Sequence, residues 1–497
     1  MNLLKRQGFL NSIVLYTGTA QGFINLILLF QRILTEEQIG YYILLTSLSL
    51  LYTQVACMGF TSVITRYLPA FKTADKGHNG FPTFVFLLCL TFFFVISIGF
   101  VVFRSSVSSM YSHDKGASLL AKYYYYILPV SFCSMLFLLQ ETFAKTAYKS
   151  VFPSFLREVV LKVSASVGVL LMLWHFLDYE GFIRIFLWTN VAIVLIITYY
   201  NYRLKIFRLT PIQQTVKSQT GVLINYGFYS MLSGSSFALI QNLDVIMLKL
   251  FGSMAQVGIY GTLFGMAIVI SLPAKALSTT SYQIIADAWQ NNELQKINKI
   301  YHKTSLMQFL IGSLLLIGLI VNWDNILTLL HKPEYANHFL VFLLVGLGFL
   351  VDITGGINAA IISFSKYYRV VMVFLICAAL LCIILNLIFI PLYGITGAAL
   401  SYFLTMLLLN FSYWLYLNIK FGFQPFNSKY LLVLFTVAIS LVIGLYIPAV
   451  ANFYLNTFIK SSVTGIVFLS MARYLKISPD INQVFDKWIF RKNTPDK

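Results

Sequence analysis

Long apolar runs set the strongest limit on how this chain can fold. A helix that crosses the hydrocarbon core of a bilayer needs about 20 mostly apolar residues, and the sequence contains about fourteen runs of that length. With 59% hydrophobic and 10% charged residues, the chain has more apolar surface than a soluble domain could bury. The sequence therefore predicts an all-α, polytopic membrane protein, with spans near residues 12–33, 39–61, 81–103, 123–145, 158–178, 182–202, 221–248, 257–279, 304–323, 337–362, 369–391, 394–418, 429–448 and 453–473.

Lysine and arginine residues gather on one side of these predicted spans. If both termini are cytoplasmic, 27 of the 35 basic residues lie in or beside cytoplasmic connections. Cytoplasmic loops of membrane proteins are enriched in these residues, so we predict cytoplasmic termini and an even number of spans. The same loops, facing anionic headgroups, account for the net charge of +18, and no nucleic-acid partner is expected.

A repeated pattern divides the spans into two sets. The sequence Gln-x-Gly-x-Tyr opens an apolar run at residues 38–42 and opens another at residues 256–260. Internal duplication of this kind is common among membrane transporters. We predict two pseudo-symmetric lobes of six spans, which superpose by rotation about an axis along the membrane normal and place span two on span eight. The predicted boundaries are 1–202 for the first lobe, 203–220 for a basic cytoplasmic linker, 221–418 for the second lobe, and 419–497 for two further spans and a basic cytoplasmic tail.

Polar side chains within or beside the spans are the candidates for substrate binding, because polar groups are costly in lipid and usually face a cavity or another helix. Eight residues form this set: Gln21, Asn25, Gln54, Arg66, Gln241, Asp244, Lys275 and Asp352. For the amides, the alternative is a purely structural hydrogen bond between helices. For Asp244, the alternative is solvation at the outer interface, whereas Asp352 lies within a span with no obvious local partner.

Two pairs of opposite charges lie near the predicted cytoplasmic ends of spans four and five. Glu141 precedes Lys145 by four residues, and Glu158 precedes Lys162 by four residues. Because residues four apart are neighbours on a helix, each pair can neutralise itself. A structural role is therefore favoured for both pairs.

The sequence carries no motif of an enzyme that could be placed on these spans. It contains no HExxH, GxSxG or Walker A sequence, and its five cysteines lie within apolar runs without metal-ligand spacing. A membrane glycosyltransferase or polymerase usually has a sizeable loop that gathers acids, histidines or arginines at one face, and no connection here is long enough. We therefore expect a transporter, with no catalytic residue, no bound metal and no cofactor.

Three segments resemble a known family. ILTEEQIGYYILLTSLSLLYTQVACMGFTSVITRYL resembles the start of bacterial polysaccharide flippases. NLDVIMLKLFGSMAQVGIYGTLFGMAIVISLP resembles them too, with its aspartate at the end of span seven and its Gly-x-Tyr entry to span eight. These flippases are part of the multidrug/oligosaccharidyl-lipid/polysaccharide exporter superfamily. GGINAAIISFSKYYRVVMV, followed by NLIFIPLYGITGAALSYFLTMLL, is similar to spans ten to twelve of that family.

The resemblance implies a function as well as a fold. It implies two six-helix lobes arranged as a V, and transport of an undecaprenyl-pyrophosphate-linked oligosaccharide, such as an O-antigen, capsule or exopolysaccharide repeat unit, by alternating access. It further implies the bacterial cytoplasmic membrane as location, the lipid-linked oligosaccharide and membrane lipids as partners, other polysaccharide-assembly proteins as candidate partners, and coupling to Na⁺ or H⁺. The alternative within the same fold is a cation-coupled exporter of drugs or metabolites.

The sequence departs from two branches of that superfamily. The lipid II flippase branch places arginines on spans one, two and eight, where this chain has Gln21, Asn25, Gln54 and an apolar stretch near Ile268. Recognition of pyrophosphate would then fall to other cations, for which the candidates are Arg32, Arg66, Lys145 and Lys275. The drug-antiporter branch often has an acid on span one, and this chain has none there. Both departures favour the polysaccharide branch.

Overall fold

The computed structural model describes residues 3–102 and 117–478, apart from the side chains of residues 3–6, 117–118, 275–280 and 283. The chain forms two compact units, which we call unit 1 (Met1–Thr262 with Leu375–Ser401) and unit 2 (Leu263–Phe374 with Tyr402–Lys497). This division differs from the predicted lobes at 1–202 and 221–418. Residues 221–262 and 375–401, which the sequence assigned to the second lobe, pack into unit 1. The pseudo-symmetric lobes stay a prediction.

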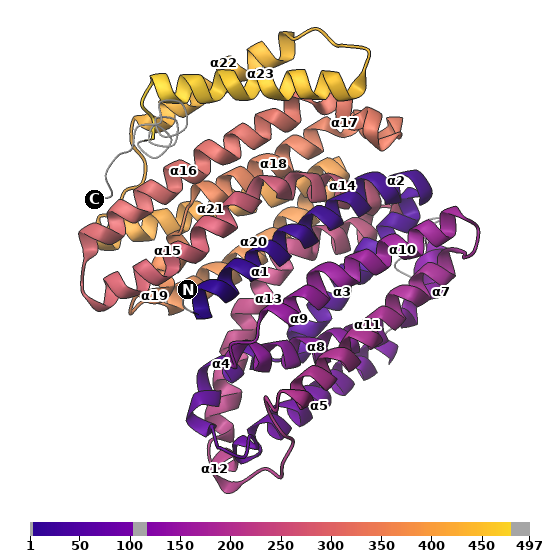
Figure 1. Cartoon of the computed structure of the whole chain (residues 1–497), viewed down its shortest axis with the longest axis vertical. Coiled ribbons are helices and arrows are strands. Elements are labelled where there is room, and N and C mark those ends of the chain that lie inside the picture. The colour runs from indigo at the N-terminus through magenta and orange to yellow at the C-terminus, as the bar shows by residue number, and fades with distance from the viewer. Residues whose placement is uncertain (1–2, 103–116, 479–497) are drawn as a thin grey trace. The chain divides into compact units, whose positions relative to one another are not determined.

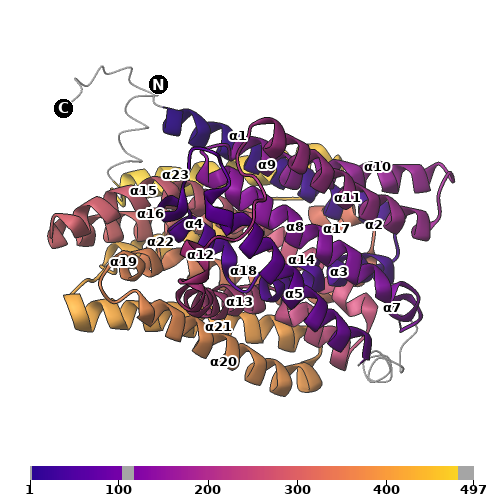
Figure 2. The same ribbon diagram turned by 90° about the horizontal axis from the view of Figure 1, so that it is seen from below.

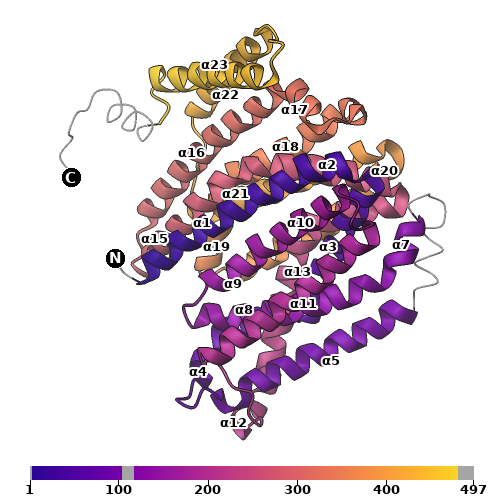
Figure 3. The ribbon, with the colours of Figure 1, turned by 45° about the vertical axis from the view of Figure 1, so that its right-hand side comes forward.

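Unit 1 is built from helices (Figure 1). Its helices, including π-helical (η1, η4) and 3₁₀ (η2, η3) turns, are α1 (Leu3–Phe23), η1 (Ile24–Leu29), α2 (Phe30–Ile33), α3 (Glu36–Ala56), α4 (Phe60–Phe71), η2 (His78–Gly80), α5 (Phe81–Val102), α7 (Ala117–Tyr123), η3 (Tyr124–Tyr126), α8 (Ile127–Thr146), α9 (Val151–Phe155), η4 (Leu156–Val160), α10 (Leu161–Leu173), α11 (Tyr179–Arg203), α12 (Gln214–Lys217) and α13 (Thr220–Phe251). In this unit α3 packs against α8 and α13, and α11 packs against α8 and α10 (Figure 3).

Three helices run from one unit into the other, and the rest form unit 2. The shared helices are α14 (Met254–Ala267), α20 (Arg369–Tyr393) and α21 (Ile395–Phe421). The remaining helices are η5 (Ile268–Ser271), α15 (Leu272–Gln290), α16 (Leu294–Val321), α17 (Trp323–Leu330), η6 (Pro333–His338), α18 (Phe339–Thr354), α19 (Asn358–Phe364), α22 (Lys429–Tyr446) and α23 (Phe453–Tyr474). Helix α16 packs against α15, α18 and the hairpin of α22 and α23, coloured yellow in Figures 1 and 2.

The predicted membrane class is confirmed. Among the described residues, thirteen helices are long and apolar enough to cross a bilayer. The other predicted span, 158–178, corresponds to the helix formed by α9, η4 and α10. This helix is long enough to span, but it carries Arg157, Glu158 and Lys162 in its first half. The chain is therefore an all-helical, multi-pass membrane protein.

The glutamine that opens the Gln-x-Gly-x-Tyr pattern has the same local role in both copies. Gln38 closes a capping box with Thr35 at the start of α3: the Gln38 amide N donates to the Thr35 hydroxyl (3.3 Å), and the Thr35 amide N donates to the Gln38 side chain (3.1 Å). Gln256 does the same with Ser253 before α14, with both distances 3.2 Å. Each glutamine thus satisfies a backbone group that the first turn of a helix leaves without a partner.

The repeated glycine places the two copies in contact. Gly40 of α3 and Gly258 of α14 both lie in unit 1, where their backbones pass so closely that a Cβ atom on either would overlap the other helix. A Cβ on Gly40 would meet the carbonyl oxygen of Met254 and would lie 3.0 Å from the Gly258 amide N. A Cβ on Gly258 would meet the carbonyl oxygen of Glu36 and would lie 3.1 Å from the Gly40 amide N. Small residues allow this approach of helices in membranes.

The second predicted span is interrupted. Helix α3 ends at Ala56, and α4 begins at Phe60, after a turn in which Gly59 adopts φ +69°. An L-residue with a side chain rarely adopts this backbone conformation. The turn lies against α13, because a Cβ on Gly59 would lie 2.5 Å from the amide N of Met231.

The predicted linker is held in place by backbone hydrogen bonds. The Arg208 amide donates to the Lys76 carbonyl (2.8 Å), and the Gln213 amide donates to the Asn79 carbonyl (3.0 Å). The connection between α4 and α5 that receives these bonds is itself folded: the Thr73 hydroxyl and the Gly77 amide donate to Asp75 and hold the pKa of its carboxyl below the ordinary value. The segment at 203–220 therefore packs as part of unit 1.

Candidate functional site

The predicted amides Gln21 and Asn25 lie together where α1 and η1 pack against α10. The Gln21 side-chain N donates to the Ser166 hydroxyl (2.6 Å), and the Asn25 side-chain N donates to the Lys162 carbonyl (2.6 Å). The Ser166 hydroxyl in turn donates to the Asn25 side-chain oxygen. Asn25 is 4% exposed. These bonds join two helices, which is the structural role that we gave as the alternative for such amides.

Close packing brings α1 onto the charged part of the neighbouring helix. A Cβ on Gly18 would lie 2.5 Å from the Glu158 carbonyl oxygen, and a Cβ on Gly22 would lie 3.4 Å from Cδ of Lys162. The two glycines are four residues apart and share one face of α1. The charged residues Glu158 and Lys162 therefore lie directly beside the glycine face of the first span.

Five charged side chains form a continuous row across α8, η4 and α10. The Glu141 carboxylate pairs with Lys145 (2.9 Å) and with Arg157 (2.6 Å), and the Glu158 carboxylate pairs with Arg157 and with Lys162 (3.2 Å each). The Glu141 side chain is 0% exposed, whereas the three cationic side chains are 32% to 43% exposed. We call these five residues the ionic row. It holds three positive and two negative charges, so one positive charge is in excess.

The sequence indicated two separate pairs, and the structure joins them through Arg157. An arginine guanidinium can donate to two carboxylates at once, since its nitrogens form a planar fork. The neighbouring positions of Arg157 and Glu158 were visible in the sequence, but the contact with Glu141, which is 16 residues earlier, depends on how the helices pack.

A second polar cluster surrounds Asp244 in unit 1. The Tyr260 hydroxyl donates to one carboxylate oxygen (2.6 Å), and the Asn386 side-chain N donates to the other (2.7 Å). The Cys382 sulfur lies 3.9 Å from that second oxygen. Asp244 is 2% exposed, so the alternative of a carboxylate solvated at the outer interface is wrong. Tyr260 is the tyrosine of the second Gln-x-Gly-x-Tyr copy.

The other predicted residues of unit 1 lie along the contact of α3 and α4 with α13. Gln54 of α3 is half-buried, and its side-chain oxygen lies 3.9 Å from the position that a Cβ on Gly234 would take. Gln241 is half-buried on α13, one helical turn from Asp244. Arg66 is exposed on α4, and its guanidinium lies over the ring of Tyr226, 4.6 Å from the centroid.

The two predicted residues of unit 2 have different outcomes. Asp352 is half-buried on α18, and it accepts a hydrogen bond from the Asn410 side-chain N of α21 (3.3 Å). Asn410 also accepts from Asn358 (3.0 Å). The sequence offered Asp352 no local partner, and the partner that the structure supplies is on another helix, 58 residues away. The side chain of Lys275, in α15, lies outside the described residues.

The hydrogen-bonded and ion-paired residues therefore form three groups: the amides on α1 with the ionic row, the Asp244 cluster, and the Asp352 pair. Gln54, Gln241 and Arg66 lie apart from these bonds, along the contact with α13. The sequence did not reveal Asn386, Tyr260 or Arg157 as members. Within the described part of the chain, no three His, Cys, Asp or Glu side chains come close enough to hold a metal ion.

Comparisons with known proteins agree with this fold. No family model matches the sequence. An uncharacterized membrane protein of Methanocaldococcus jannaschii is 21% identical over 439 residues, which cover 83% of each chain. Among solved structures, the lipid II flippase MurJ in an inward closed conformation superposes with a TM-score of 0.76 at 14% identity, covering 94% of this chain and 98% of that one.

A second group of solved structures comprises multidrug exporters. An inward-facing multidrug resistance MATE family transporter of the MOP superfamily superposes with a TM-score of 0.64 at 12% identity, over 83% of this chain and 98% of that one. The chain thus has the fold that the lipid II flippase shares with MATE transporters. This fold class is the one that the sequence predicted.

Proposed function

We propose that this chain is a flippase that moves a polyprenyl-pyrophosphate-linked oligosaccharide from the cytoplasmic to the outer leaflet. The fold supports a flippase or an exporter. The observation that favours an anionic substrate is the ionic row, because it carries an excess positive charge and its three cations keep part of their surface exposed. An exporter of cationic drugs would gain nothing from such a row.

The ionic row suits capture of a pyrophosphate. The Glu141 and Glu158 carboxylates hold the cationic side chains in place, so that little side-chain freedom is lost when an anion binds. A pyrophosphate accepts charge-assisted hydrogen bonds from lysine and arginine. The polyprenyl tail stays in lipid, and the half-buried amide of Gln54 supplies hydrogen bonds of the kind that sugars need.

The Asp244 cluster suits coupling to Na⁺ or H⁺. Its carboxylate is buried, and it faces neutral hydrogen-bond donors on two other helices. The Asn386 side-chain oxygen is buried as well, and it accepts no hydrogen bond from the described residues. Oxygen atoms such as those of the Asp244 carboxylate, the Asn386 side-chain amide and the Tyr260 hydroxyl are the ligands that a hard cation prefers. Protonation of the carboxyl would be the alternative way to remove the buried charge.

Transport by the purified, reconstituted protein tests the proposed substrate. A fluorescent polyprenyl-pyrophosphate-linked oligosaccharide in proteoliposomes becomes accessible to an external reductant when it is flipped. Lys162→Gln should lower the rate of flipping about tenfold, which is the effect of losing one charge-assisted hydrogen bond. Lys162→Arg should keep most of the wild-type rate. Glu158 keeps its pairing with Arg157 in both variants, so both should fold.

The exposed residue Lys217 of α12 provides the matched control. Lys217→Gln removes the same charge far along the chain from the ionic row, and it should transport at the normal rate. If Lys162→Gln flips the oligosaccharide normally while the wild-type protein expels a cationic dye along an ion gradient, the exporter alternative is correct and the flippase proposal is wrong.

A further inference from the structure

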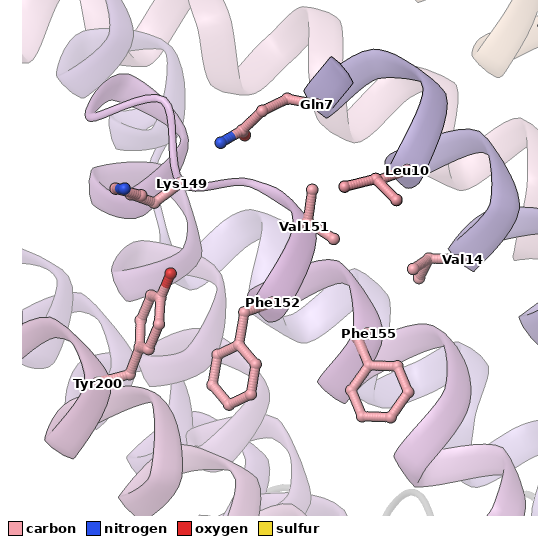
Figure 4. A pocket seen from close by; sticks show the side chains of 8 residues that line it. All are labelled: Gln7, Leu10, Val14, Lys149, Val151, Phe152, Phe155 and Tyr200. Carbon is pink, nitrogen blue, oxygen red and sulfur yellow. The ribbon is translucent and has the colours of Figure 1, made fainter. Parts of the chain in front are cut away.

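A cavity of about 470 Å³ lies in unit 1 between the first turns of α1, the start of α9 and the end of α11 (Figure 4). Eight residues line it: Gln7, Leu10, Val14, Lys149, Val151, Phe152, Phe155 and Tyr200. Its size is within the range of roughly 300–1,000 Å³ that is usual for small-ligand sites. The cavity is separate from the amide contacts, the ionic row and the Asp244 cluster described above.

The lining is divided into a polar end and an apolar end. Figure 4 shows the tips of Gln7, Lys149 and Tyr200 toward one end, and the side chains of Leu10, Val14 and Phe155 toward the other. None of the eight described lining residues is acidic, and Lys149 is exposed. An amphiphile with an anionic head and an apolar chain matches this division.

Fixed contacts hold the polar end open. The Gln7 side-chain oxygen accepts from the Ser150 amide (3.3 Å) and from the Ser150 hydroxyl (3.2 Å), which leaves the Gln7 nitrogen directed to the cavity (Figure 4). The Phe152 and Tyr200 rings contact each other with centroids 4.6 Å apart. Side chains that are already ordered lose little freedom when a ligand binds.

We propose that this cavity binds one anionic phospholipid of the cytoplasmic leaflet, with its phosphate at Lys149 and an acyl chain along Leu10, Val14 and Phe155. Basic pockets between membrane helices on the cytoplasmic side are typical headgroup sites, and the cavity lies at the predicted cytoplasmic ends of its helices. A single lysine matches the single charge of a phosphodiester, whereas a pyrophosphate would call for more cations. The site goes beyond the transport function, and it does not depend on which substrate is moved.

Native mass spectrometry of the full-length, delipidated protein tests this site. Phosphatidylglycerol and phosphatidylcholine with identical acyl chains are added separately, and the bound fraction is measured. The wild-type protein should bind one phosphatidylglycerol in preference to phosphatidylcholine. Lys149→Gln should weaken phosphatidylglycerol binding about tenfold, since it removes one charge-assisted hydrogen bond, and Lys149→Arg should keep the preference.

Two further variants separate the headgroup from the chain and from general charge. Val14→Trp fills the apolar end and should weaken binding of both lipids. Lys217→Gln removes an exposed cation elsewhere in unit 1 and should change neither. Equal phosphatidylglycerol binding by Lys149→Gln and the wild-type protein would overturn the proposal. So would displacement of phosphatidylglycerol by a polyprenyl pyrophosphate at equimolar concentration, because the cavity would then be a substrate site. If Val14→Trp does not fold, the two Lys149 variants decide the question alone.

Discussion

The contact between Gly40 and Gly258 predicts a measurable loss of stability when either glycine gains a methyl group. Alanine is the better helix former, and it gains about 1 kcal/mol over glycine in a helix interior. Against this gain, overpacking costs about 1–3 kcal/mol and sometimes more. The obstacles here are backbone atoms of the facing helix, namely the Met254 carbonyl oxygen for Gly40 and the Glu36 carbonyl oxygen for Gly258, and these cannot rotate away.

The cost should therefore be at or above the upper end of that range. Gly40→Ala and Gly258→Ala should each lower the free energy of unfolding by about 2 kcal/mol after the helix-propensity gain is subtracted. Both substitutions add a methyl group to the same contact between α3 and α14, so their effects on the free energy of unfolding should not add. Once one methyl group has pushed α3 and α14 apart, the second should cost less.

The free energy of unfolding can be measured for the purified, full-length protein by denaturation with dodecyl sulfate in mixed micelles. Gly99→Ala is the matched control, because Gly99 is also in a helix, α5, and a Cβ there would meet no described atom within 4 Å. That variant should be as stable as the wild-type protein or slightly more so. If Gly40→Ala proves as stable as Gly99→Ala, the two copies of the repeat do not meet through these glycines, and the account of the repeat is wrong.

Three further predictions concern other parts of the chain. Asp244→Asn should abolish the dependence of transport on Na⁺ or H⁺ while the folded yield is kept, and unchanged ion dependence in proteoliposomes would place coupling elsewhere. Asp352→Asn should slow transport several-fold with little loss of folded protein, as judged by gel filtration, whereas a purely structural aspartate would lower the folded amount. Gly59→Ala should be less stable than Gly422→Ala. Both glycines have positive φ (+69° and +70°), but only a Cβ on Gly59 would overlap the backbone of α13. Equal melting temperatures would show that backbone strain alone sets the cost, which is about 1–2 kcal/mol for a side chain in this conformation.

The ionic row and the Asp244 cluster show how polar groups are arranged within one compact unit. In both, a buried carboxylate accepts hydrogen bonds from a donor on another helix: Glu141 from Arg157, and Asp244 from Tyr260 and Asn386. The two clusters differ in charge: the row has an excess of cations, whereas the neutral donors around Asp244 leave its charge unbalanced. This difference is the reason for assigning substrate capture to one and ion coupling to the other.

The sequence by itself determined the class of protein and most of its helices. A helix in lipid satisfies its backbone hydrogen bonds within one segment, so a run of about 20 apolar residues is enough to predict it without knowledge of its neighbours. The Gln-x-Gly-x-Tyr repeat could likewise be recognised in the sequence. The capping role of Gln38 and Gln256 is local, since each glutamine forms hydrogen bonds with a residue three positions away.

The tertiary structure alone decided which polar residues meet. Asn386 reaches Asp244 from 142 residues away, and Asn410 reaches Asp352 from 58 residues away. In the same way, the role of Gly40 and Gly258 depends on the packing of α3 against α14, which the sequence pattern does not specify. Association of helices in a membrane depends on close packing and on hydrogen bonds between segments that are distant in sequence. Since the pattern of a single helix specifies which face is polar but not which helix will cover that face, the partners could be known only from the packed structure.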